Sequence, residues 1–181
     1  EVRKEIDKLN LEYQGRLKLY FGVESNVMSY KGTNDIKPEE LSLLDGVNLG
    51  FHYGIINPDL KSFFYFWIAN PLAKIFKSMK PWIRGKNTDA LINIIKNNKI
   101  QIITHPGDKV PVNIKRLAEA CQKYGTALEI NSSHENLSVD DLEEIKDMEV
   151  LLSIGSDAPS PRRIGDFEKA LKRLEEVGIY H

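Results

Sequence analysis

The segment of residues 100–107, with the sequence IQIITHPG, constrains the fold more than any other stretch of the chain. A short run of β-branched apolar residues lies between a polar stretch at 97–99 and the Pro106-Gly107 pair, which predicts a buried strand rather than a helix. His105 follows the end of this strand. In parallel α/β proteins, ligand and metal side chains meet at the carboxyl ends of the strands. Taken alone, His105 is either such a ligand or a hydrogen-bonded histidine near the core.

Similar short apolar runs recur along the chain and alternate with segments of helical periodicity. Strands are expected at 17–24, 47–51, 100–103, 127–130 and 150–154, and helices at 1–12, 38–44, 87–97, 111–124, 138–145 and 165–177. Asn87 or Thr88 is expected to cap the third of these helices, Gly125 to end the fourth, and Ser138 with Asp141 to form a capping box for the fifth. Because the spacings are too long for hairpins, we expect parallel strands joined by right-handed crossovers. The sequence predicts a single α/β domain over residues 1–181 and leaves undecided whether its sheet is open or closed into a barrel.

Composition excludes several classes of protein. The formal net charge of −1 gives no electrostatic reason to expect nucleic acid or a membrane surface as a partner. A single cysteine, Cys121, excludes a disulfide framework, and we expect a core thiol in a reducing, cytoplasmic compartment. No apolar run is long enough to span a bilayer. Since the chain begins at Glu1 rather than Met, we expect it to be a piece of a longer protein.

The segment 53–84 is aromatic and apolar with basic flanks, and it stands out as an insert within the domain. Pro71 interrupts it, so a kinked pair of helices or a lid over the strand ends is expected. An exposed aromatic face here could instead form a subunit contact. The sequence does not choose between these alternatives.

Four residues able to bind a metal follow or end four of the predicted strands: Glu24, His52, His105 and Asp157. Two imidazoles and two carboxylates at one edge of a parallel sheet form a ligand set that suits zinc, manganese or iron. Carboxylates can bridge ions, which favours a multinuclear centre that activates water. The alternative gives each residue a local role, with the acids in turns and the histidines in isolated polar contacts.

Other polar residues are weaker candidates. Glu129 lies within a predicted strand. Its side chain could either point outward or orient a metal ligand without binding the metal itself, and we favour the second role. His134 follows a polar turn and is expected on the surface, and His181 is the terminal residue and is expected to be disordered. Ser156 lacks the glycine pattern of a nucleophile elbow, so a nucleophilic serine is not expected.

Five motifs of the chain resemble, in order, motifs of the PHP (polymerase and histidinol phosphatase) superfamily, with the bacterial stand-alone phosphoesterases the most similar. The motifs are GVESN (22–26), GFH (50–52), THPG (104–107), LEINSS (128–133) and GSDAPSP (155–161). The resemblance implies a distorted seven-stranded βα barrel with a metal cluster, usually trinuclear, at the carboxyl ends of its strands. It also implies that Glu24, His52, His105 and Asp157 are metal ligands.

The chain departs from the PHP pattern in two places. The H-x-H strand and the Asp-His strand that open such domains are not in this sequence, so the resemblance covers the later two-thirds of a PHP domain. The last motif usually reads Gly-Ser-Asp-x-His, but here Pro159 stands at the histidine position and cannot bind a metal.

The resulting hypothesis is part of a metal-dependent phosphoesterase, in which metal-activated water hydrolyses a small phosphorylated substrate. For this chain alone we expect weak metal binding, little turnover and possible homo-oligomers formed through open sheet edges or the aromatic insert. One alternative is a catalytically degenerate PHP module kept for metal binding or protein interaction. Another is an unrelated metal-dependent amidohydrolase on a similar barrel.

Overall fold

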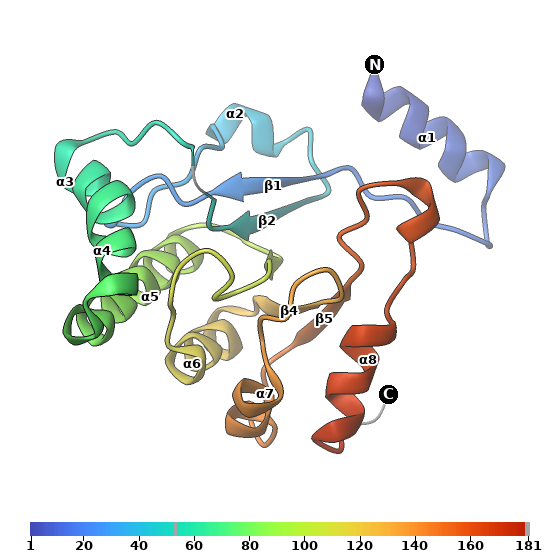
Figure 1. Cartoon of the computed structure of the whole chain (residues 1–181). Coiled ribbons are helices and arrows are strands. Elements are labelled where there is room, and N and C mark those ends of the chain that lie inside the picture. Colours follow the sequence, from blue (N-terminus) through green and yellow to red (C-terminus); the bar gives the residue numbers. More distant parts are fainter. Residues whose placement is uncertain (53, 180–181) are drawn as a thin grey trace.

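The computed structural model describes residues 1–52 and 54–179, and its centre is one parallel β-sheet (Figure 1). Within the described residues, five strands pair in the order β1-β2-β3-β4-β5, each parallel to the next. The strands are β1 (Gly22–Asn26), β2 (Gly46–Gly50), β3 (Ile102–Ile103), β4 (Ala127–Asn131) and β5 (Leu152–Gly155). The predicted parallel α/β architecture is therefore confirmed. This sheet does not by itself make the seven-stranded barrel, which remains a prediction.

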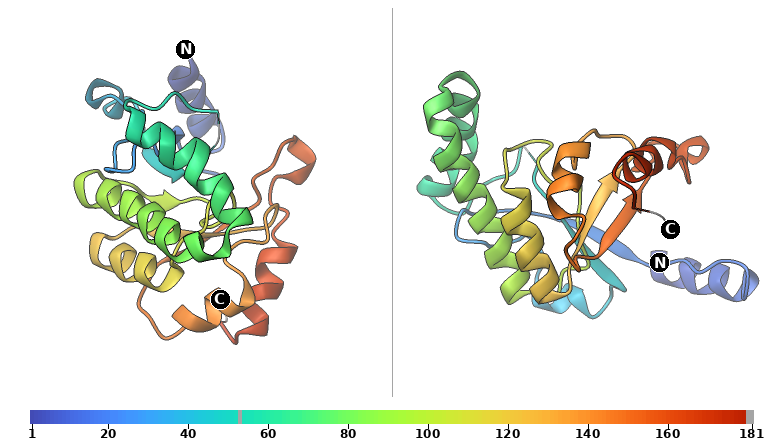
Figure 2. Two further views of the ribbon diagram at one scale, coloured as in Figure 1. Left: turned by 60° about the vertical axis from the view of Figure 1, so that its left-hand side comes forward. Right: turned by 90° about the horizontal axis from the view of Figure 1, so that it is seen from below.

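Helices follow the strands and pack beside one another in chain order along the sheet (Figures 1 and 2). They are α5 (Lys80–Asn97), α6 (Ile114–Tyr124), α7 (Val139–Ile145) and α8 (Glu168–Glu176). Because each strand pairs with the next one in sequence, every crossover advances in the same direction. Crossovers that advance in one direction and share one hand place their helices on one face of the sheet.

The two faces of the sheet differ sharply in chemistry. Side chains alternate between faces along each strand, and register partners in neighbouring parallel strands share a face. One face carries the buried apolar residues that pack against the helices, namely Val47, Leu49, Ile103, Leu128 and Ile130. The opposite face carries small and polar residues, including Glu24, Asn48, Gly50, Glu129, Asn131 and Gly155. This second face is therefore built for polar contacts rather than for an apolar core.

Two helices precede the main crossovers and contribute little to the core. The first, α1 (Val2–Glu12), lies where a helix was predicted, but it has no buried residue, and Leu11 is 75% exposed. It stands away from the sheet (Figure 1) and is held by the ion pair of Arg3 with Asp45 at 2.7 Å. The second, α2 (Pro38–Leu41), is a single short turn with a proline in its first turn, as predicted, but it ends before the predicted Leu44.

The aromatic insert is helical and lies beside α5, at the end toward which the β1 and β2 arrows point (Figure 1). It contains α3 (Leu60–Phe63), the π-helix η1 (Phe64–Ala69), α4 (Asn70–Ile75) and the short η2 (Lys77–Met79). The turn before Pro71 is this π-helix, in which the Asn70 N–H donates to Tyr65 O, five residues back; the kink itself stays a prediction. A wider turn just before a proline makes room for its ring, so the helix continues. Tyr53, where the insert was predicted to begin, and His181 lie outside the described residues.

The start of α5 corrects a sequence prediction. The helix begins at Lys80 with a proline in its first turn, and not near Asn87 or Thr88. Asn87 is instead buried in the helix, where its amide pairs with the amide of Asn70 at 2.8 Å and donates to Pro111 O at 3.0 Å. These bonds fasten the insert to the domain. Cys121 is a buried core thiol, as predicted, and burial raises its pKa to about 12.

Candidate metal centre

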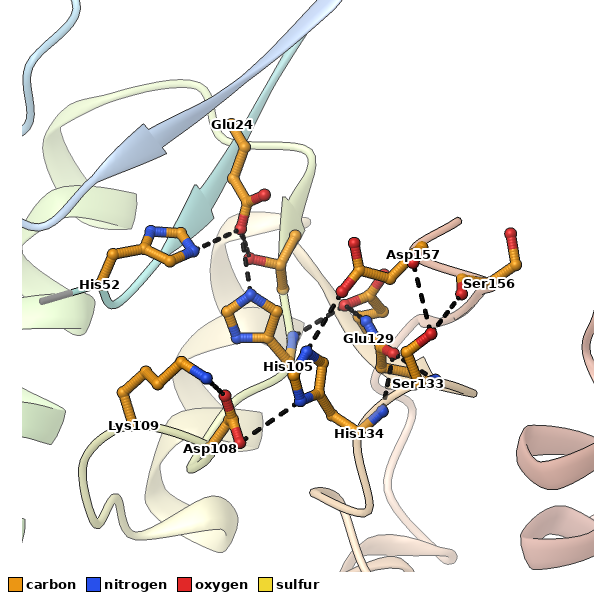
Figure 3. A network of polar contacts seen from close by, with 12 residues as sticks. Glu24, His52, His105, Asp108, Lys109, Glu129, Ser133, His134, Ser156 and Asp157 are labelled. Atoms are coloured by element: carbon orange, nitrogen blue, oxygen red, sulfur yellow. Dashed lines mark hydrogen bonds and ion pairs between the residues drawn. The ribbon is translucent and has the colours of Figure 1, made fainter. Parts of the chain in front are cut away.

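Three of the four predicted ligands converge on the polar face of the sheet, at the carboxyl end of β1, β2 and β3. Glu24, His52 and His105 each offer one ligand atom, and these atoms all lie within 4.8 Å of one another (Figure 3). Glu24 Oε1 lies 3.4 Å from His52 Nε2 and 3.2 Å from His105 Nε2. Glu24 is the middle residue of β1 rather than the last, so the predicted strand 17–24 was placed too early.

A glycine in β2 makes this close arrangement possible. A Cβ atom built on Gly50 would overlap with Glu24 Oε1 and His52 Cε1 and would crowd Thr104 Oγ1. Thr104 in turn donates a hydrogen bond to Glu24 Oε1. Position 50 therefore needs glycine, because Glu24, His52 and Thr104 fill the space that a Cβ atom would occupy.

The orientation of His52 is fixed by two residues outside the cluster. Asn26 Nδ2 donates to Asp35 Oδ2 at 2.6 Å, and a carboxylate can only accept, so the amide oxygen of Asn26 faces His52. Asn26 Oδ1 lies 2.8 Å from His52 Nδ1, which must therefore carry the proton. The lone pair of His52 is then on Nε2, the nitrogen that faces Glu24, as a metal ligand requires.

His105 is held in an unusual backbone conformation. Its φ of 29° is in the left-handed region, which a residue with a Cβ adopts at a cost. Its backbone N–H donates to Glu129 Oε2 at 2.8 Å, and Asn131 Nδ2 donates to the same oxygen at 3.0 Å. Glu129 is buried and accepts a hydrogen bond from the backbone of His105, which fits the predicted role of orienting a metal ligand without binding the metal.

The cluster has complementary charges in the absence of metal. The hydrogen bond with His105 lowers the pKa of Glu24 to about 2, against the opposing effect of burial, with smaller contributions from Thr104 and His52. Burial on its own would lower the pKa of His105, but the bond to Glu24 and its negative charge raise it above the ordinary value. Glu24 is therefore ionised at neutral pH, and a cation is favoured next to it.

Asp157, the fourth predicted ligand, lies next to the cluster but not within it. It follows β5, adopts a φ of 43°, and places Oδ2 3.2 Å from His134 Nε2. His134 Nδ1 lies 3.5 Å from Asp108 Oδ1, and the His134 ring centroid is 5.2 Å from that of His105 (Figure 3). Asp157 thus pairs with His134, whose ring lies beside that of His105, and metal binding by all four residues remains a prediction.

Sequence reasoning missed the place of His134, which was expected to be a surface residue. Its side chain is 30% exposed and lies between two carboxylates. The turn after β4 directs it there, because Asn131 Oδ1 accepts the N–H groups of Ser133 at 2.7 Å and His134 at 3.0 Å. The Asn131-Ser132-Ser133 sequence is a recognisable signal for such a turn.

The three converging residues fit a divalent metal ion. One carboxylate oxygen and two imidazole nitrogens are the ligand types found on zinc, manganese and non-haem iron, and three protein ligands leave positions for water or substrate. The tautomer of His52 and the ionised state of Glu24 both suit this use. Among the described residues, this is the one group of three or more histidine, cysteine or acidic side chains close enough to share an ion.

Similarity to known proteins agrees with this chemistry. The chain is 32% identical over 167 residues to a probable phosphatase of Shewanella frigidimarina and 32% identical over 169 residues to one of Caldanaerobacter subterraneus subsp. tengcongensis. The chain is thus related to bacterial proteins named probable phosphatases. Each alignment covers 87% of this chain, but 58% and 57% of the relatives, so the chain spans somewhat more than half of their length.

No protein-family model matches the chain. Within the part of the chain that the structure describes, no helix is both long and apolar enough to cross a membrane.

Proposed function

We propose that this chain is part of a metal-dependent phosphoesterase of the PHP type, which hydrolyses a small phosphorylated substrate. The observation that carries the proposal is the convergence of Glu24, His52 and His105, with ligand atoms within 4.8 Å of one another. The names of the relatives support phosphate ester hydrolysis, and the ordered motifs support the PHP assignment and its seven-stranded barrel.

Each residue of the cluster has a stated part in this function. Glu24 and the Nε2 atoms of His52 and His105 would hold the ion, Asn26 keeps the proton of His52 on Nδ1, and Glu129 anchors the backbone of His105. A divalent ion held there would supply a Lewis acid for the phosphoryl group and lower the pKa of the attacking water. Asp157, whose Oδ2 lies 3.2 Å from His134 Nε2, is proposed as a further ligand of a multinuclear centre.

A catalytically degenerate PHP module is the second candidate, and two observations favour it. Pro159 stands at the usual histidine position and is exposed, and Asp157 faces His134 instead of the three converging ligands. Such a module would bind metal through the same three residues but would not turn over substrate.

An assay of p-nitrophenyl phosphate hydrolysis with and without added manganese separates the two candidates. Turnover that EDTA and Glu24→Gln both abolish supports the phosphoesterase. Metal binding without turnover supports the degenerate module. Turnover that neither EDTA nor Glu24→Gln affects would overturn both, as would metal-dependent cleavage of an amide in place of a phosphoester.

A further inference from the structure

A basic groove runs beside the candidate metal centre. The insert, the start of α5 and the loop after His105 enclose a hollow of about 600 Å³. A second hollow of about 430 Å³ continues along α5 toward the start of α6. Both are lined by Lys77 and Lys80 and therefore adjoin, and we call the two hollows together the lysine groove.

The lining of the lysine groove is rich in basic residues. Its basic residues are Lys74, Lys77, Lys80, Arg84, Lys109 and Arg116. Four of them interact within the protein: Arg84 Nε donates to Val112 O at 2.8 Å, Arg116 pairs with Asp89 at 2.6 Å, and Lys74 and Lys109 also have partners. The ammonium groups of Lys77 and Lys80 have no hydrogen-bond or ion-pair partner among residues 1–52 and 54–179. The two central lysines are thus exposed cations that face a shared hollow.

The acidic member of the lining, Asp108, links the groove to the metal centre. Lys109 Nζ contacts its Oδ2, and its Oδ1 lies 3.5 Å from His134 Nδ1 (Figure 3). Burial on its own would raise the pKa of Asp108, but the bond to Lys109 and the nearby His134 hold it below its ordinary value. Lys109 therefore offsets the negative charge of Asp108. As a result, Asp108 does not neutralise the positive charges of Lys77 and Lys80.

We propose that the lysine groove binds a second phosphate group of the substrate, so that the substrate is a bisphosphorylated small molecule. This inference rests on the proposed function, which places the scissile phosphate at the Glu24–His52–His105 cluster. The groove is a separate hollow that meets the site at Asp108, so Lys77 and Lys80 remain available for another anionic group. Lysine ammonium groups bind phosphate as flexible point charges, which suits a substrate anchored elsewhere by the metal.

Calorimetric titration of the metal-free chain, in EDTA, with inorganic tripolyphosphate tests the groove by itself. We expect the unmodified chain to bind, and the double variant Lys77→Glu/Lys80→Glu to bind at least about tenfold more weakly, since two charge-assisted contacts are lost. The matched control is Lys96→Glu/Lys99→Glu, which reverses two exposed charges at the opposite end of α5 and should leave binding unchanged. Equal loss in both variants, or no binding by the unmodified chain, would overturn the proposal.

A second measurement connects the groove to turnover. With manganese present, Lys77→Glu/Lys80→Glu should raise KM for glucose 1,6-bisphosphate and leave KM for glucose 6-phosphate unchanged. An equal change for both substrates would refute a role in binding the second phosphate. If neither substrate is hydrolysed, the proposed function fails, and the tripolyphosphate titration still decides whether the groove binds phosphate.

Discussion

Asn26 positions His52 through a single hydrogen bond, with Asn26 Oδ1 2.8 Å from His52 Nδ1. The amide is oriented in turn by Asp35, which accepts bonds from Asn26 Nδ2 at 2.6 Å and from the Asn26 N–H at 2.8 Å. The carboxylate thus decides which nitrogen of His52 is free to bind a metal, although it makes no contact with the cluster itself. Partners of this kind orient metal ligands and tune their affinity.

Asp35→Asn should therefore weaken metal binding by roughly 10–100-fold, because Asn26 can turn and present its NH₂ group to His52. Titration with zinc or manganese measures the effect, and circular dichroism shows whether the fold is kept. Asp147→Asn removes an exposed carboxylate far from the site and is the control. Unchanged affinity in Asp35→Asn would show that the orientation of His52 does not depend on this relay.

Gly50→Ala should abolish metal binding while the chain still folds. The new Cβ would displace the Glu24 carboxylate and the His52 ring, both of which have room to move because they are partly exposed. Gly85→Ala is the control, since nothing lies within 4 Å of a Cβ there. Gly85 is inside a helix, so this control should raise stability by about 0.5–1 kcal/mol. Metal affinity equal to that of the unmodified chain in Gly50→Ala would contradict the described packing.

The stability of the metal-free chain should depend on pH through Glu24 and His105. The pKa of His105 is raised in the folded state, so its contribution is complete below pH 6.5 and is lost as the pH rises through the folded value. The pKa of Glu24 is lowered from 4.5 to about 2, so its contribution is present above pH 4.5 and is lost as the pH falls toward 2. The pair therefore stabilises the fold most between about pH 4.5 and 6.5.

Thermal unfolding in EDTA from pH 5 to 9 tests this dependence. Glu24→Gln should lower Tm most near pH 5–6 and much less near pH 9. A Tm difference that stays constant across the range would contradict the linkage. With metal added, the unmodified chain should instead gain stability as the pH rises, because metal binds the neutral imidazole of His105.

Local signals in the sequence predicted several details that the structure confirms. Gly125 ends α6 with a φ of 71°, and Ser138 and Asp141 form the predicted capping box of α7. β2 begins and ends within one residue of the predicted strand. These features depend on neighbours a few residues away, so the sequence pattern contains the information that determines them.

Features that depend on distant contacts were predicted less well. Asn87 has a side chain typical of a helix cap, but it lies inside the longer helix α5. Its side-chain amide instead donates a hydrogen bond to Asn70, which is distant in the sequence. The apolar residues of α1 suggested a buried face, yet that helix packs on no hydrophobic core among the described residues. His134 reaches the site because the loop after β4 contacts the loops after β3 and β5. These three loops are far apart in the sequence, so no local pattern predicts that they meet.

Metal titration of His105→Ala beside His134→Ala tests the central claim most directly. Both variants remove one imidazole from the same region, but only His105 has a nitrogen within the converging group of ligands. We predict that His105→Ala loses zinc or manganese binding by at least about tenfold, as expected for one ligand of three, while His134→Ala retains affinity close to that of the unmodified chain. Equal metal affinity in the two variants would contradict the assignment of the site to Glu24, His52 and His105.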